Sequence, residues 1–166
     1  TNLINSEILN NQNLNANLNL DFKKISNSNY LRNFKIKFFL QEGRLLLKDS
    51  SIDWNDSILI KLNEIELLTN DNQIKFVGTV TFEFKDITTF YSYYQIRRNN
   101  RSNIKTIRLD FLYDLNQEKI TLDNFKIDNK DPKNIDEFIS LFNTQNKNIF
   151  NKVTFRNFIK DFFSVY

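Results

Sequence analysis

Apolar and polar residues alternate without interruption from Leu14 to Phe22. The apolar positions are Leu14, Ala16, Leu18, Leu20 and Phe22, and Asn or Asp fills each position between them. Because successive side chains of a β-strand point to opposite faces, this pattern predicts a strand with one apolar and one polar face. Further alternating or apolar segments, separated by short polar turns, span residues 33–41, 44–54, 58–68, 73–84, 104–113 and 119–128.

These segments predict a mainly β protein with about seven to nine antiparallel strands over residues 1–130. The strands are expected to form either a curved sheet or a β-sandwich-like meander. Gly43 precedes one predicted strand, and Gly78 lies inside another, where a bulge or a close backbone approach needs a residue without a side chain. The chain begins at Thr1 and contains no Met, so we expect it to be a segment of a longer protein.

Residues 131–166 predict two amphipathic helices packed on the sheet, in one structural unit with it. Asp131 and Pro132 predict the capping residue and first position of a helix that carries an apolar stripe over 135–142. Thr154 is predicted to cap the second helix, whose phenylalanines and isoleucine recur at helical spacing over 155–163. The aromatic segment 87–96 predicts a short helix capped near Asp86 or Thr88, with a strand as the alternative.

The composition excludes most common enzyme chemistry within this chain. It has no His and no Cys, which removes Ser-His-Asp and Cys-His catalysis, disulfides and His or thiolate metal sites, and two glycines are too few for a phosphate-binding loop. Carboxylates close in sequence remain at Asp53 and Asp56, Glu64 and Glu66, and Asp110 and Asp114. Such pairs are common on solvated strand faces, so we predict a non-enzymatic protein with no catalytic residue, metal site or cofactor.

Two segments could form a binding surface. Tyr91, Tyr94, Arg97, Arg98 and Arg101 mix aromatic rings with cations, as platforms for single-stranded nucleic acid do, although tyrosines packed on the sheet beside an exposed turn give the same pattern. Trp54, the single tryptophan, could stack on a ligand or pack in the core. The net charge of +3, from 23 basic and 20 acidic residues, disfavours a dedicated nucleic-acid-binding protein.

The strand series resembles the repeating β units of the AsmA-like family. The resemblance covers residues 42–54, then 58–68 and 74–84 with Gly78, in a rhythm of a glycine-led strand, a polar turn, a second strand, and a third strand with its own glycine. The run Leu-Asp-Asn-Phe-Lys-Ile-Asp over 122–128 and the two predicted helices resemble the C-terminal portion of such a protein.

This resemblance implies a periplasmic protein that is anchored in the inner membrane by an upstream helix and takes part in phospholipid transfer and outer-membrane biogenesis. Its curved sheet is expected to shelter acyl chains on the apolar face, with Leu14, Ala16, Leu18, Leu20 and Phe22 as candidate lipid contacts. Phospholipid and other envelope proteins are the partners it implies. The alternative is a β-sandwich adhesion module that recognises protein or glycan around Trp54 and the segment 97–101.

Overall fold

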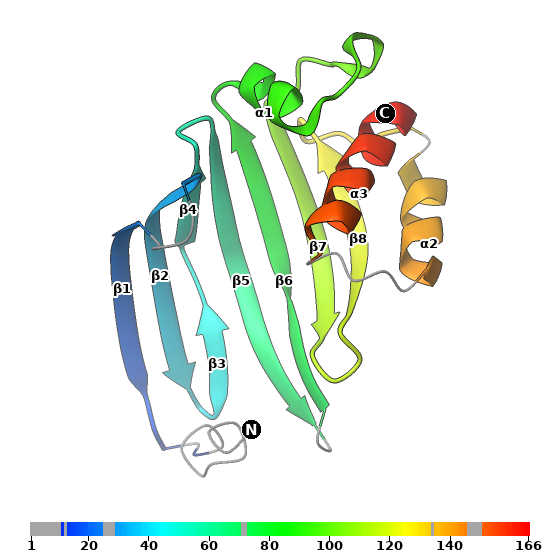
Figure 1. Ribbon diagram of the computed structural model, residues 1–166. Coiled ribbons are helices and arrows are strands. Elements are labelled where there is room, and N and C mark those ends of the chain that lie inside the picture. Colours follow the sequence, from blue (N-terminus) through cyan, green and yellow to red (C-terminus); the bar gives the residue numbers. More distant parts are fainter. Residues whose placement is uncertain (1–10, 12, 25–28, 71–72, 134, 146–150) are drawn as a thin grey trace.

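The computed structural model describes residues 11, 13–24, 29–70, 73–133, 135–145 and 151–166. Over these residues the chain forms one antiparallel sheet of eight strands with three α-helices (Figure 1). This confirms the predicted mainly β fold with two C-terminal helices, and decides for a single sheet over a sandwich. The strands are β1 Ala16–Lys24, β2 Leu31–Gln41, β3 Arg44–Leu47, β4 Ser50–Trp54, β5 Ile58–Asn70, β6 Gln73–Phe84, β7 Thr106–Asp114 and β8 Lys119–Ile127.

The strand order is β1-β2-β3-β5-β6-β7-β8, and β4 pairs with both β2 and β5. The single strand predicted over 44–54 is therefore wrong, because β3 and β4 are separate strands. Asp49 between them has a positive φ of 48°, outside the extended region of the backbone, and it lies at the break. Ser50 is buried at the break, where its hydroxyl accepts from the Lys37 N–H and donates to the Lys48 carbonyl.

One face of the sheet is apolar from edge to edge. Residues directly opposite each other in an antiparallel pair share a face. A single cross-strand row runs through every strand of the main path: Ala16, Leu40, Leu45, Leu67, Phe76, Tyr113 and Ile120. The alternation read from the first strand thus extends across the whole sheet.

Three α-helices and a 3-10 turn complete the fold: α1 Ile87–Tyr94, η1 Arg98–Asn100, α2 Ile135–Gln145 and α3 Lys152–Val165. Asp86 caps α1 by accepting from the Thr88 N–H, which confirms the short helix predicted there. Asn151 caps α3, so the prediction of Thr154 as its cap is wrong. The predicted start of the preceding helix at Pro132 is also wrong, because α2 begins at Ile135.

The core lies where the helices meet the sheet. In Figure 1, α1 crosses the end of the sheet near β4 and β6, while α3 lies in front of β7 and β8. Phe163 is almost fully buried and packs edge-on against Tyr91, with ring centroids 5.1 Å apart, and Phe162 packs against Phe125 of β8 at 5.2 Å. The helices therefore cover one side of the apolar face and leave the β1 side uncovered.

Candidate functional site

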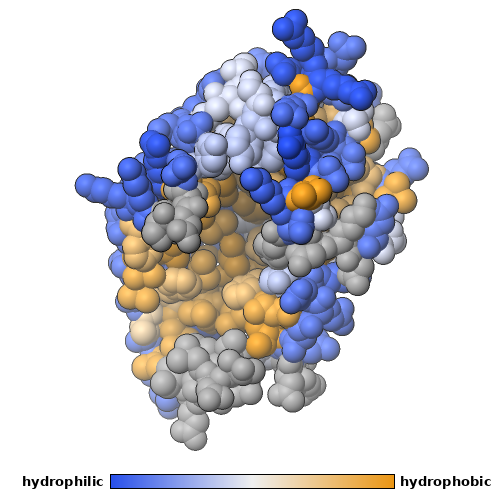
Figure 2. Space-filling view, in the orientation of Figure 1, coloured by the Kyte–Doolittle hydropathy of each residue, from blue (hydrophilic) through white to orange (hydrophobic). Residues whose placement is uncertain are grey.

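An open apolar hollow of about 440 Å³ lies between the sheet, α1 and α3. Figure 2 shows it as a sunken hydrophobic surface bordered by hydrophilic residues. Its walls come from four neighbouring strands, from β3, and from two helices. The lining residues are Leu47, Leu62, Ile65, Phe76, Val80, Phe82, Phe84, Phe90, Ile107, Leu109, Phe111, Tyr113, Ile120, Leu122, Phe125, Phe155, Phe158, Ile159, Phe162 and Phe163.

The strand register explains the wall formed by the sheet. Val80 of β6 lies opposite Leu62 of β5 and Leu109 of β7, so three apolar side chains stand side by side at its centre. Other rows on this face are also apolar, with Phe82 opposite Ile107 and Phe76 opposite Tyr113. Period-two alternation in each strand, kept in register across the sheet, thus produces a continuous apolar wall.

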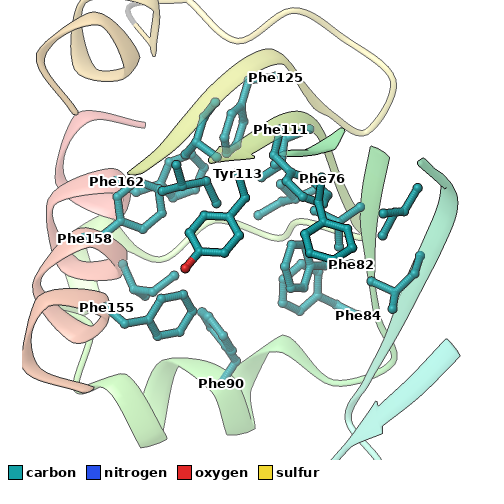
Figure 3. A pocket seen from close by; sticks show the side chains of 18 of the residues that line it. Phe76, Phe82, Phe84, Phe90, Phe111, Tyr113, Phe125, Phe155, Phe158 and Phe162 are labelled. Carbon is teal, nitrogen blue, oxygen red and sulfur yellow. The ribbon is translucent and has the colours of Figure 1, made fainter. Parts of the chain in front are cut away.

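The opposite wall is the apolar stripe of α3. Phe155, Phe158 and Phe162 point from the helix into the hollow, and Phe90 closes the end beneath α1 (Figure 3). Phe158 also packs on Phe142 of α2, with ring centroids 4.8 Å apart, which helps to fix the wall from behind. The stripe therefore both packs α3 and lines the hollow.

The chemistry of the hollow is that of an apolar binding site. Of its lining residues, only Tyr113 carries a side-chain polar atom, and Figure 3 shows its hydroxyl directed toward Phe155 and Phe158. None of the lining side chains is an acid, a base or an amide. Its volume falls in the range of about 300–1,000 Å³ typical of small-molecule sites. The arrangement can hold a hydrocarbon chain, and the Tyr113 phenol is the one ionisable group among its lining side chains.

The predicted lipid contacts on the first strand share the apolar face but stand outside this hollow. Leu18, exposed at 53%, lies opposite Phe38 of β2, which lies opposite Leu47 at the hollow's rim. Ala16, Leu20 and Phe22 occupy the same face of β1, with Phe22 46% exposed. Leu14 precedes the strand and is half-buried. These residues extend the apolar face toward the β1 edge.

The structure buries the rings of the predicted binding surface and leaves its cations exposed. Trp54, Tyr91 and Tyr94 are buried, so their ring faces belong to the core. Burial, with a smaller contribution from the nearby Tyr93 phenol, raises the pKa of Tyr94 to about 12. Burial also raises the pKa of Tyr91, whose hydroxyl donates to the Ser102 carbonyl at 2.6 Å.

The cations of that surface are exposed and lie together. Three exposed cations lie in and beside η1: Arg97, Arg98 and Arg101. The Arg101 Nε donates a hydrogen bond to the Ile96 carbonyl, and the Arg101 guanidinium lies over the Tyr91 ring. These cations therefore stay at the surface while the aromatic residues of the same segment build the core.

Five of the six sequence-adjacent carboxylates have separate structural partners, and the sixth, Glu64, is exposed on β5. Asp53 accepts from Asn33 and lies 3.9 Å from the Lys85 ammonium, and Asp56 pairs with Arg32 at 3.2 Å. Asp110 accepts from Thr79 and Asn124, Asp114 from the backbone N–H groups of Asn116 and Gln117, and Glu66 from Arg44. Within the described part of the chain, no group of three or more acidic residues is placed to hold a metal ion.

The hollow's own residues were not among the predicted site residues, although the signal for them was present. Segments 58–68, 73–84 and 104–113 alternate as the first strand does, and the apolar stripe over 155–163 predicts a helix that packs on the sheet. Which part of a long apolar face stays open depends on where the helices lie, and alternation does not specify that.

Comparison with protein-family models, with curated proteins and with solved structures finds no match to this chain. Among the helices of the described residues, none is long and apolar enough to cross a membrane.

Proposed function

We propose that this chain is a non-catalytic lipid-binding module that shelters phospholipid acyl chains on the apolar face of its sheet. In this proposal it is the C-terminal part of an AsmA-like envelope protein that acts in phospholipid transfer and outer-membrane biogenesis in the periplasm, with an anchor in the inner membrane. The observation that carries the proposal is the open hollow of about 440 Å³ whose lining has no charged side chain.

Hydrocarbon is the ligand chemistry that this lining favours. Transfer of apolar surface from water into such a site is favourable by roughly 25 cal/mol per Å². A charged or strongly polar ligand would lose its hydration and find only the Tyr113 hydroxyl among the lining side chains. Among the described residues, no helix lies over the apolar face toward β1, and the exposed Leu18 and Phe22 there give a long chain a path beyond the hollow.

Lipid extraction and native mass spectrometry on the chain purified from a bacterial envelope fraction test this function. Val80→Trp fills the centre of the hollow, because Val80 lies on its floor between Leu62 and Leu109. The matched control is Leu112→Trp, which adds the same indole to the opposite, outer face, where Leu112 is 36% exposed.

We expect phospholipid to co-purify with the wild type and with Leu112→Trp, and to be lost or strongly reduced in Val80→Trp. Circular dichroism establishes that both variants are folded. A wild type that carries no phospholipid and takes up none from added vesicles would refute the proposal. Equal lipid content in all three proteins would place the lipid elsewhere and would also refute it.

A further inference from the structure

The surface around α1 and η1 carries a concentration of positive charge. Between Ile87 and Leu109 the chain has five Lys or Arg residues and no Asp or Glu. Arg97, Arg98, Arg101 and Lys105, here called the basic loop, are all exposed. No ion pair joins any of these four side chains to an acidic residue of the described chain.

Two carboxylates lie near the basic loop, and they leave it with excess positive charge. The Asp128 carboxylate accepts from the backbone N–H groups of Lys105 and Thr106. Asp161 of α3 shares a shallow polar hollow with Arg97 and a further cation, Lys160. The four cations of the loop and Lys160 therefore outnumber these two nearby acids. Two further acids at this end of the molecule have partners of their own, since Asp86 caps α1 and Asp56 pairs with Arg32.

The basic loop is held in a defined conformation. The Tyr91 hydroxyl donates to the Ser102 carbonyl and accepts from the Ser102 N–H, which ties the loop to α1. The Arg101 Nε donates to the Ile96 carbonyl at 3.0 Å, and the Asn100 N–H donates to the Arg97 carbonyl. The cations are thus presented by a fixed scaffold.

Exposed aromatic residues on and beside α1, the helix that precedes this loop, are connected to the apolar hollow. Tyr30 and Tyr93 are 42% and 38% exposed, and their rings pack edge-on at 5.0 Å. Both rings contact Trp54, which packs against Phe90 at 5.8 Å, and Phe90 lines the hollow. A chain of aromatic contacts therefore runs from the surface to the end of the hollow.

We infer that this end of the molecule, formed by the basic loop with Tyr30 and Tyr93, docks on the surface of an anionic phospholipid membrane. Cations near such a surface contribute about 1 kcal/mol each to binding. Tyrosine, with an apolar ring and a polar tip, suits the headgroup level of a bilayer. The inference rests on the proposed function, because docking here would bring the end of the hollow to the source of its lipid.

The geometry favours a membrane over single-stranded nucleic acid. Stacking on bases requires open ring faces. Tyr91 and Tyr94 are buried, and Tyr30 and Tyr93 pack against each other and against Trp54. Of these four tyrosines only Tyr30 and Tyr93 are exposed, and their rings are already engaged with each other and with Trp54, which suits lipid headgroups better than stacked bases.

Co-flotation of the full chain with vesicles tests the inference. One set of vesicles is phosphatidylcholine alone, and in the other about a third of the lipid is phosphatidylglycerol. Arg97→Gln/Arg98→Gln removes two exposed cations of the basic loop. The control, Lys75→Gln/Lys119→Gln, removes the same amount of charge from two half-buried lysines near the starts of β6 and β8, at the opposite end of the sheet (Figure 1). Trp54 provides a second readout, through quenching by lipids brominated near the headgroup.

We expect the wild type and the control to bind anionic vesicles with quenched Trp54 emission, and binding to weaken as salt is raised. Arg97→Gln/Arg98→Gln should bind at least about tenfold more weakly, since two surface cations are lost. Equal binding to neutral and anionic vesicles, or equal loss in both double variants, would overturn the inference. So would binding of a single-stranded oligonucleotide in preference to vesicles.

The phospholipid content of the same protein samples separates this inference from the proposed function. Phospholipid in the hollow without preference for anionic vesicles would leave the function standing and refute the docking surface. Binding to anionic vesicles by a protein whose hollow takes up no lipid would support the docking surface and refute the proposed function.

Discussion

The side-chain amide of Asn143 hydrogen-bonds both backbone groups of Leu122, with its Oδ1 accepting from the Leu122 N–H and its Nδ2 donating to the Leu122 carbonyl, each at 2.9 Å. Leu122 lies in β8, an edge strand, and its side chain lines the apolar hollow. The amide of α2 thus takes the place of a neighbouring strand at the middle of this edge, and it blocks edge-to-edge pairing there.

Asn143→Leu should therefore destabilise the protein. The substitution keeps the size of the side chain but leaves a half-buried N–H and carbonyl of β8 without their partner. Two lost hydrogen bonds of about 0.5–1.5 kcal/mol each predict a loss of roughly 1–3 kcal/mol. Urea denaturation followed by circular dichroism measures it, with Asn157→Leu at an exposed position of α3 as the control. An unchanged midpoint for Asn143→Leu would show that the amide contributes nothing to stability.

A second close relationship shapes the apolar face. A Cβ placed on Gly78 of β6 would lie 2.7 Å from both the Cα and the Cγ1 of Ile65 in β5. At this point the register of the two strands shifts between Asn63 and Glu66, and Glu64 has a positive φ of 50°. The bulge turns the Ile65 side chain into the space above Gly78, where it forms part of the hollow's wall.

Gly78→Ala is expected to cost about 1–3 kcal/mol of folding free energy, because the backbone at Ile65 must shift to admit the methyl group. Gly78→Val should cost more. Thr81→Ala, on the same strand but outside the bulge, serves as a control with a smaller effect. Thermal denaturation orders the variants, and a neutral Gly78→Ala would show that the bulge adjusts freely.

The strands and their faces could be predicted from the sequence because alternation repeats in nearly every segment and each turn is short and polar. The break between β3 and β4 could not be predicted, because residues 44–54 are apolar enough to form one strand. The break depends on the backbone at Asp49 and on the hydrogen bonds of the buried Ser50 hydroxyl. The cap of α3 was misplaced for a similar reason, because both Asn151 and Thr154 are suitable capping residues and packing selects between them.

The hollow was harder to predict than the fold. Alternation identifies an apolar face but not which part of it a helix covers, and the first strand, where the pattern is clearest, lies at the edge of the sheet rather than in the hollow. Three cations of the basic loop, Arg97, Arg98 and Arg101, were predicted from the sequence. Tyr30 was not, because that tyrosine meets Trp54 and Tyr93 only through the pairing of β2 with β4.

The ion pair between Arg44 and Glu66 predicts a pH-dependent contribution to stability. The Arg44 guanidinium donates from Nε and Nη2 to the two carboxylate oxygens at 2.6 and 2.8 Å, and this hydrogen bonding lowers the pKa of Glu66. A lowered pKa in the folded state means that the contribution is complete above the ordinary Glu pKa of about 4.3 and is lost as pH falls through the lowered value.

Glu66→Gln should consequently be less stable than the wild type at neutral pH, and the difference should shrink in strongly acidic buffer. A double-mutant cycle with Arg44→Gln isolates the interaction between the two side chains, and urea denaturation at each pH measures it. A coupling energy that is the same at neutral and acidic pH would mean that the carboxylate charge does not contribute.

Because Tyr94 is buried, its phenol is predicted to lose its proton at a higher pH than an exposed tyrosine does. Burial raises its pKa from the ordinary value of 10.0 to about 12, so the folded protein keeps this phenol protonated at a pH where the unfolded chain releases the proton. The stability gained from neutral Tyr94 is complete below pH 10 and falls as pH rises through about 12. Burial also raises the pKa of Tyr91, so an ultraviolet titration of phenolate absorbance should show a late component of the same size in the wild type and in Tyr30→Phe, and one smaller by a single phenol in Tyr94→Phe. A late component of unchanged size in Tyr94→Phe would show that Tyr94 titrates with the exposed tyrosines and would contradict its burial in the folded protein.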